Sequence, residues 1–368
     1  MERLLRTPIA LLLLLVAACS QSLSLPMDVS ITTLPNGLTV IAQEDHAAEL
    51  VGIDIWVKAG TRFETADNNG VSHFLEHLLF GATEKRKAGD MDREMESLGA
   101  TLNAHTHRDY THFSTTISSR FLTKALDIFA DAFLHSQFPA ENVELERLVI
   151  LDEIARKQSN PIAVCRDLLA ARVFGSHPYR LPLEGTIQSI RRITRDDILD
   201  YYRRCYVPAN IAIVLVGDFD KSAVISAVAT AFEGASGTIA AKPPAPKAVT
   251  QPSPVEESVK MDFKSSYLAI GFLGPPAASI EDVCAMDVLL TYLGQGHYSW
   301  LTNELRNKQG IVGEASADFV TQHDPGLINI IASAKPADLP KAREAILAKL
   351  TQMSTSPVET FDIDRAKR

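Results

Sequence analysis

The stretch HFLEHLLF, residues 73–80, places two histidines and a glutamate within five positions of an otherwise apolar run. In a helix, positions i and i+4 lie on one face and position i+3 lies beside them. His73 and His77 can therefore hold one metal ion from the same side, while Glu76 is free to take a proton from water. The alternative is a helix with two core histidines and a salt-bridged glutamate, and five residues alone do not decide between the two.

A catalytic zinc site usually has three protein ligands and one open position, so two histidines leave an ion one ligand short. The run ENVELERLVILDEIARK, residues 141–157, has helical spacing. Glu146 and Glu153 lie seven residues apart in it and share one face, about 10 Å apart along the axis. One ion cannot bind both, and spacing leaves either glutamate open as the third ligand.

The elements that must position these residues follow from the hydrophobic periodicity. Alternation predicts a strand pair around a Pro-Asn-Gly turn in 29–45, a strand in 50–60 and a further strand pair in 101–118. A strongly apolar run predicts another strand in 210–219. Helical spacing predicts helices at 70–80, 88–100, 120–135 and 141–160, and further helices up to Tyr206. This mixture of sheet strands and packed helices predicts an α+β fold.

The chain is predicted to contain two homologous domains, each a mixed or antiparallel sheet packed with helices. The first domain spans 27–235, a Pro/Ala-rich linker spans 236–257, and the second domain spans 258–368. Matching blocks recur at an offset of about 215 residues. The second copy has LLTYL where the first has HFLEH, so it is predicted to be metal-free. It is also expected to be C-terminally incomplete, which would leave its strands around YLAIGFL and GLINIIASA exposed.

The net charge of -9, with no basic run, argues against a nucleic-acid binder. The N-terminus has a basic start, a short apolar core and the sequence VAAC, which resembles the lipobox of bacterial lipoproteins. We therefore expect a signal peptide at 1–19, a lipid anchor on Cys19 and an exported, periplasmic protein held to a membrane only by that anchor. Plain secretion with cleavage nearby is the alternative.

Four ordered blocks resemble the pitrilysin (insulinase) family of zinc peptidases over roughly residues 30–335. They are GVSHFLEHLLFGAT, LGATLNAHTHRDYTHFSTTIS, ERLVILDEI and HPYRLPLEGT, and the first contains the inverted zinc-protease motif H-x-x-E-H. The resemblance implies one Zn²⁺ per chain, held by His73, His77 and Glu153. It assigns Glu146 a supporting role without ligation and makes Glu76 the general base of peptide hydrolysis.

In the family that these blocks resemble, the segment 101–118 forms an exposed edge that holds the substrate as an added strand. The resemblance therefore implies that Asn103 and Ala104 contact the substrate. Alternation predicts that His105 and His107 share one face and that His112 lies on the other. These histidines are expected to be surface side chains, with a second metal site as the alternative.

The resemblance also implies an arginine and, seven residues later, a tyrosine that bind the substrate and stabilise the oxyanion. Arg306 occupies the first position, but Gly313 occupies the second. We therefore expect a heterodimer with a metal-free family member that supplies an Arg–Tyr pair, or a homodimer in which Arg306 alone serves each site. The predicted activity is hydrolysis of peptides or unfolded segments; the alternative is a non-catalytic peptide-binding or scaffolding lipoprotein of the same fold.

Overall fold

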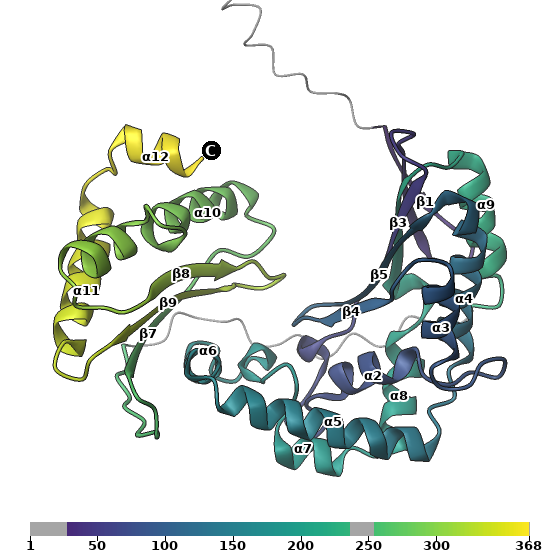
Figure 1. Cartoon of the computed structure of the whole chain (residues 1–368), viewed down its shortest axis with the longest axis horizontal. Helices are drawn as coiled ribbons and strands as arrows, with labels where there is room; N and C mark the ends of the chain where they lie inside the picture. The colour runs from purple at the N-terminus through teal and green to yellow at the C-terminus, as the bar shows by residue number, and fades with distance from the viewer. Residues whose placement is uncertain (1–27, 236–253, 368) are drawn as a thin grey trace, which may run out of the picture.

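The computed structural model describes residues 28–235 and 254–367, which form two lobes of sheet and helix (Figure 1). The expected signal peptide with Cys19, and most of the expected linker, lie outside the described residues. Within the described ranges no helix combines the length and the apolar character that a membrane span requires. The α+β class predicted from the sequence is confirmed.

The first lobe is built on a six-stranded sheet in the order β1-β2-β6-β3-β5-β4. Its strands are β1 (Val29–Thr33), β2 (Thr39–Glu44), β3 (Leu50–Val57), β4 (Asn103–Thr106), β5 (Thr111–Ser118) and β6 (Ile211–Gly217). Neighbouring strands are antiparallel except β2 and β6, which are parallel. The sheet is therefore mixed, and the short strand β4 lies at one of its edges.

Burial alternates along β3, so one face of the sheet is packed and the other is more open. Figure 1 shows α3, α4 and α9 on one side of this sheet. The helices of the lobe are α2 (Val71–Leu79), α3 (Asp90–Ser97), α4 (Leu122–His135), α5 (Ala140–Gln158), α6 (Pro161–Val173), α7 (Ile187–Arg192), α8 (Arg195–Cys205) and α9 (Lys221–Ala231). Fully buried phenylalanines such as Phe74, Phe113 and Phe129 fill the core, and burying each contributes about 1.5–3 kcal/mol.

The second lobe has a three-stranded antiparallel sheet in the order β7-β9-β8. Its elements are β7 (Ser266–Leu273), α10 (Ile280–Gly294), the π-helix η5 (Leu301–Lys308), β8 (Ala315–Val320), β9 (Leu327–Ala334), α11 (Leu339–Thr355) and α12 (Thr360–Ala366). Ser266 lies 216 positions after Leu50, and Leu327 lies 216 positions after Thr111. Because β7-β9-β8 also repeats the order β3-β5-β4, the second lobe repeats half of the first sheet.

The expectation that the central strands of the second lobe would be exposed is wrong for β9. Every residue of β9 except Ser333 is buried. One face packs against the helices of its own lobe. The other face packs against α6 of the first lobe, where Val173, Leu327 and Leu273 belong to one apolar cluster. A Cβ at Gly271 of β7 would meet the side chains of Leu169 and Val173 on α6 at 3.0 and 3.1 Å, so this glycine permits the close approach. A helix of the first repeat therefore covers the sheet of the second.

Candidate metal centre

The buried carboxylate of Glu64 binds backbone amides at the start of helix α2. The Glu64 side chain accepts hydrogen bonds from the backbone amides of Gly70 and Ser72, both at 2.9 Å. Burial raises the pKa of Glu64, although these hydrogen bonds oppose the shift. A carboxylate at a helix N-terminus satisfies unpaired N–H groups and interacts favourably with the helix dipole. The sequence analysis did not predict this role for Glu64; the available signal was an acidic residue seven positions before the first residue of the helix.

Gly70, the residue directly before α2, has a backbone conformation that favours glycine. Its φ of 94° lies in the left-handed region, where glycine has no steric cost. A Cβ at this position would lie 2.8 Å from the Glu184 carbonyl oxygen and 2.6 Å from the Ile190 Cδ1 atom. The helix that carries His73 is thus held against the segment that follows α6.

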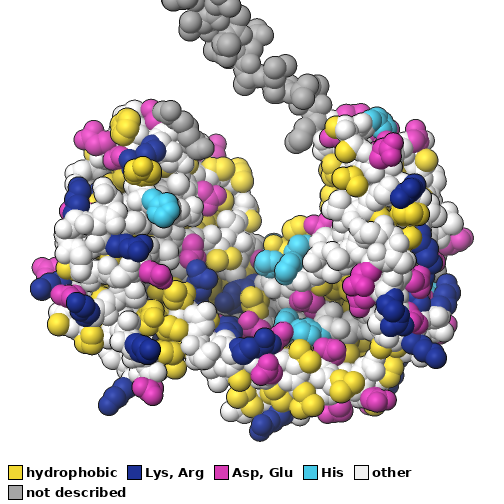
Figure 2. Space-filling model, viewed as in Figure 1, with side chains coloured by type: hydrophobic (Ala, Val, Ile, Leu, Met, Phe, Trp, Pro, Cys, Tyr) yellow, Lys and Arg dark blue, Asp and Glu magenta, His cyan; other side chains and the backbone are white. Residues whose placement is uncertain are grey.

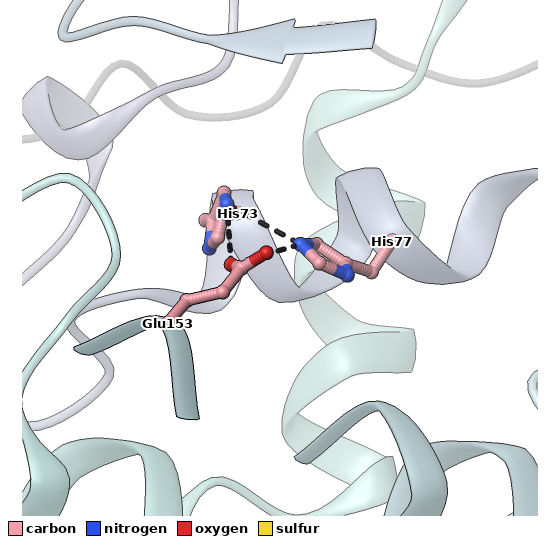
Figure 3. Close-up of side chains that lie close together, drawn as sticks. All are labelled: His73, His77 and Glu153. Atoms are coloured by element: carbon pink, nitrogen blue, oxygen red, sulfur yellow. Dashed lines mark hydrogen bonds and ion pairs between the residues drawn. The ribbon is translucent and has the colours of Figure 1, made fainter. Parts of the chain in front are cut away.

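Three candidate ligands converge between α2 and α5, as Figure 3 shows. The Nε2 atoms of His73 and His77 lie 3.3 Å apart, and Glu153 Oε2 lies 3.8 and 3.5 Å from them. In a tetrahedral zinc site with bonds of about 2.0–2.2 Å, neighbouring ligand atoms lie roughly 3.3–3.6 Å apart. Among the residues that the structure describes, this is the one group of three or more such side chains whose ligand atoms converge within 4.8 Å. The donor set and its spacing fit a zinc ion.

Glu146 and Glu153 occupy different positions around this cluster. Glu153 approaches the Nε2 atoms of both histidines, whereas Glu146 Oε2 lies 3.0 Å from His77 Nδ1, the ring nitrogen on the far side. A carboxylate at that nitrogen fixes the tautomer and orientation of a metal-binding histidine. The side-chain directions thus place Glu153 beside both Nε2 atoms and Glu146 on the opposite side of the His77 ring.

The two histidines differ in their electrostatic surroundings. Burial and the neighbouring charges of His77 and Lys157 lower the pKa of His73 to about 4, so its ring is neutral at pH 7, the form that binds a metal. Burial also acts to lower the pKa of His77, but the Glu146 hydrogen bond and the nearby carboxylates raise it overall. Within the described residues, His73 Nδ1 is buried without a hydrogen-bond partner.

Glu76 lies on α2 beside the cluster. Its Oε2 atom accepts a hydrogen bond of 2.5 Å from Thr106 Oγ1 on β4. Burial raises the pKa of Glu76, and the hydrogen bond from Thr106 opposes the shift. A cavity of about 380 Å³, whose lining includes His73, Glu76, Thr106 and Glu184, opens at this point. The carboxylate is thus placed at a space that water and a substrate can enter.

Glu184 was also missed by the sequence reading. It lines the same cavity, and Lys157 holds it with an ion pair of 2.6 Å while also pairing with Asp167 at 2.9 Å. Lys157 lies one helical turn after Glu153 in the sequence. No local sequence pattern joins Glu184 to this cluster, because the contact depends on how α6 returns the chain to α5.

The histidines of the β4–β5 hairpin share one face. His105 pairs directly with His112, and the ring centroids lie 5.4 Å apart, with His107 and His112 at 5.7 Å. The prediction that His112 lies on the opposite face is wrong. Thr106 pairs with Thr111, so even-numbered residues of β4 lie opposite odd-numbered residues of β5. The odd-numbered His105 and the even-numbered His112 are therefore on the same face of the sheet.

These hairpin histidines do not form a second metal group among the described residues. Figure 2 shows histidine side chains gathered in the hollow between the two lobes. The rings of His107 and His112 lie among aromatic side chains. The ring centroids of Trp56 and His112 are 4.9 Å apart, and those of Tyr110 and His107 are 4.6 Å apart.

The residues predicted to contact the substrate lie in different lobes, on β4 and on η5. Asn103 and Ala104 lie on the edge strand β4, with the Asn103 side chain exposed. Arg306 is exposed on η5, and within the described residues its side chain makes no hydrogen bond or ion pair. Gly313 donates its amide to the Ser333 carbonyl oxygen at 2.8 Å. Among the described residues, no hydrogen bond or ion pair joins Arg306 or Gly313 to the histidine–glutamate cluster.

Helix α2 carries H-x-x-E-H, the motif of inverted zinc peptidases. Residues 39–187 match the model of the insulinase family, peptidase family M16, and residues 192–368 match that of the M16 inactive domain. The chain belongs to the M16 (insulinase) family of peptidases, which confirms the resemblance found in the sequence.

Relatives and solved structures agree with this assignment. An uncharacterized zinc protease of Streptomyces coelicolor is 32% identical over 91% of this chain and 74% of its own length. A probable mitochondrial-processing peptidase subunit beta of Arabidopsis thaliana is 28% identical over 96% of this chain and 68% of its own. The crystal structure of a protease from Helicobacter pylori superimposes with a TM-score of 0.85 at 26% identity, covering 93% of this chain and 83% of that one.

Proposed function

We propose that this chain is a zinc-dependent endopeptidase that hydrolyses peptides or unfolded protein segments. The observation that carries the proposal is the convergence of His73 Nε2, His77 Nε2 and Glu153 Oε2 beside Glu76. A bound zinc ion supplies Lewis acidity, which activates water at neutral pH and polarises the scissile carbonyl.

The side chains of the cluster then have separate tasks. His73, His77 and Glu153 hold the ion, and Glu146 keeps the His77 ring in the orientation that presents Nε2. Glu76 accepts the proton of the attacking water and returns it to the leaving amine, a contribution of about 10²–10⁴-fold. The edge strand β4, with Asn103 and Ala104, takes the peptide as an added strand.

We further propose that a partner completes the site. Gly313 offers no hydroxyl where a tyrosine is expected, and loss of one oxyanion donor costs about 10²–10³-fold in turnover. The name of the Arabidopsis relative describes it as a subunit, which supports a heterodimer with a metal-free family member carrying an Arg–Tyr pair. A homodimer using Arg306 from each chain is the other arrangement. Activity that appears only on mixing supports the heterodimer, and full activity of a monomer contradicts both.

The cellular location is proposed from the N-terminal sequence alone. The basic start, the apolar run and VAAC before residue 20 support export to a bacterial periplasm with a lipid on Cys19. Cells grown with labelled palmitate should incorporate label into the wild-type protein and not into Cys19→Ser. Equal labelling of both proteins would contradict the anchor.

The substitution Glu76→Gln tests the catalytic proposal, because it removes the base and spares the ligands. Wild type, Glu76→Gln and the exposed control Glu96→Gln should each bind about one zinc per chain. The rate of hydrolysis of quenched peptides, measured with and without the partner, should fall by about 10²–10⁴-fold in Glu76→Gln and should not fall in Glu96→Gln. Zinc-free protein after purification without chelator, or peptide binding without cleavage in every mixture, would instead support the non-catalytic alternative that Gly313 favours.

A further inference from the structure

The Thr106 hydroxyl links the edge strand to the proposed base. Its Oγ1 atom donates to Glu76 Oε2 at 2.5 Å, which is the length expected of a hydroxyl bonded to a carboxylate. We propose that Thr106 is a positioning residue that aligns Glu76 with a peptide bound along β4. This inference rests on the proposed peptidase function and adds to it the element that sets the base against its substrate.

The direction of the Thr106 side chain follows from the strand. His105 lies on the same face as His112, among the rings of the more open side of the sheet. Because successive residues of a strand point to opposite faces, Thr106 points to the other side, toward α2. A β-branched side chain has few χ1 rotamers. The strand therefore fixes where the hydroxyl, and with it the Glu76 carboxylate, is held.

The main chain of Thr106 faces the free edge of the sheet. The His107 amide donates to the Tyr110 carbonyl oxygen at 2.8 Å, so His107 directs its main-chain groups toward the partner strand. Along an antiparallel strand these groups alternate in direction. Thr106 and Ala104 consequently present their N–H and C=O groups to the open edge of β4, where a peptide strand would pair.

One residue thus bonds the proposed base through its side chain and faces the peptide through its backbone. A peptide paired with Thr106 has its position fixed relative to Glu76 without any movement of α2. Displacement of a reacting group by about 1 Å can cost about 10²-fold in rate. Loss of the hydroxyl should therefore reduce turnover while leaving the paired peptide and the metal ligands in place.

The test compares Thr106→Val, which keeps the shape, with Thr106→Ser, which keeps the hydroxyl. Thr115→Val is the matched control, because the Thr115 hydroxyl bonds the Thr101 carbonyl oxygen at 2.8 Å, away from Glu76. In the zinc-loaded chain with its partner, Thr106→Val should lower kcat by about 10- to 100-fold and change KM by less than about twofold. Thr106→Ser should recover most of kcat, and Thr115→Val should retain it.

Two readouts do not depend on catalysis. Zinc affinity should be the same in Thr106→Val and wild type. In metal-free protein, Thr106→Val should lower Tm by less in the Glu76→Ala background than in wild type. Thr115→Val should lower Tm by the same amount in both backgrounds. Such coupling identifies the hydrogen bond even if a variant is poorly stable.

Each outcome decides the inference. Unchanged kcat in Thr106→Val, or additivity with Glu76→Ala, overturns the positioning role and leaves the proposed peptidase function intact. A rise in KM with constant kcat overturns it as well, because the hydroxyl would then serve binding alone. A wild-type chain that binds zinc and cleaves nothing in any mixture overturns the peptidase function, and this role with it.

Discussion

At the scale of single residues, the two glutamates of α5 carry different chemistry from one helix face. Glu153 Oε2 approaches both Nε2 atoms, and Glu146 contacts the outer nitrogen of His77. A ligand and its supporting carboxylate both contribute to tight metal binding, but removing the supporting carboxylate weakens metal affinity by only about 10- to 100-fold.

We therefore predict that Glu153→Gln loses zinc, while Glu146→Gln retains it with an affinity about 10- to 100-fold weaker. Zinc affinity measured by competition with a chelating dye checks both variants. Glu144→Gln is the control, because Glu144 is exposed and pairs with Arg147 at 3.0 Å. Retention of zinc by Glu153→Gln together with its loss from Glu146→Gln would reverse the assignment.

Local spacing accounts for the residues that sequence could predict in the site. His73, Glu76 and His77 lie within one helical turn and a half, so periodicity alone places them together. Glu64 and Thr106 could not be found in this way, because their roles depend on backbone amides and on a strand 30 residues away. His112 shows the limit of alternation, which fails wherever a turn changes parity.

At the scale of elements, the start of α2 depends on one buried side chain. Glu64→Ala would leave the Gly70 and Ser72 amides without their acceptor. We predict a loss of about 1–3 kcal/mol in the free energy of unfolding, the usual cost of buried unsatisfied groups. Denaturant titration measures it, with Asp67→Ala as an exposed control; equal stability of Glu64→Ala and wild type would show that the cap is dispensable.

A second element-scale feature is the charge cluster that joins the chain after α2 to α3 and α4. The Arg86 guanidinium bonds Glu94 at 2.9 Å, Asp127 at 2.7 Å and the buried Asp131 at 2.6 Å. Hydrogen bonds from Arg86 and Lys124 lower the pKa of Glu94 from 4.5 to about 2. A lowered native pKa gives stability that is present above pH 4.5 and is lost as pH falls toward 2.

We predict that Glu94→Gln lowers stability at pH 7 and that its unfolding midpoint approaches that of wild type as pH falls from 4.5 toward 2. The effect should diminish in high salt, because the Glu94 side chain is one-third exposed. Denaturant midpoints measured between pH 3 and 7 check the trend, and Glu96→Gln serves as the control. Parallel curves for Glu94→Gln and wild type would rule out this linkage.

At the scale of the whole molecule, α6 and a polar contact beside the hairpin join the two lobes. Asp324 of the second lobe bonds Arg62 at 2.9 Å and lies 3.3 Å from His177 Nε2. Its neighbour His323 donates its backbone amide to Asp109 at 2.9 Å. The lobes are thus tied together next to the turn that ends β4.

Breaking this contact should loosen the lobes without unfolding either one. We predict that Asp324→Ala widens the distance distribution between fluorescent labels placed on the two lobes, since Arg62 and His177 lose their shared acceptor. Glu281→Ala, at an exposed acid of α10, is the control. An unchanged distribution in Asp324→Ala would show that α6 packing alone fixes the arrangement.

The internal repeat predicted matching strands in the two domains, and β7, β9 and β8 follow β3, β5 and β4 at a nearly constant offset. The same reasoning failed for the surface of β9. Repeat matching assigns each helix to its own copy, whereas Leu169 and Val173 of α6 cross to the other sheet. Which helix covers which sheet depends on tertiary packing that periodicity does not encode.

The central claim is that His73, His77 and Glu153 form the zinc centre of a peptidase. The most direct measurement is an anomalous difference map from crystals of zinc-loaded protein, recorded on both sides of the zinc absorption edge. We predict one peak, about 2.0–2.2 Å from each histidine Nε2 and from a Glu153 oxygen. A map without a peak there, or with its peak at the hairpin histidines instead, would show that these three residues do not form the zinc centre.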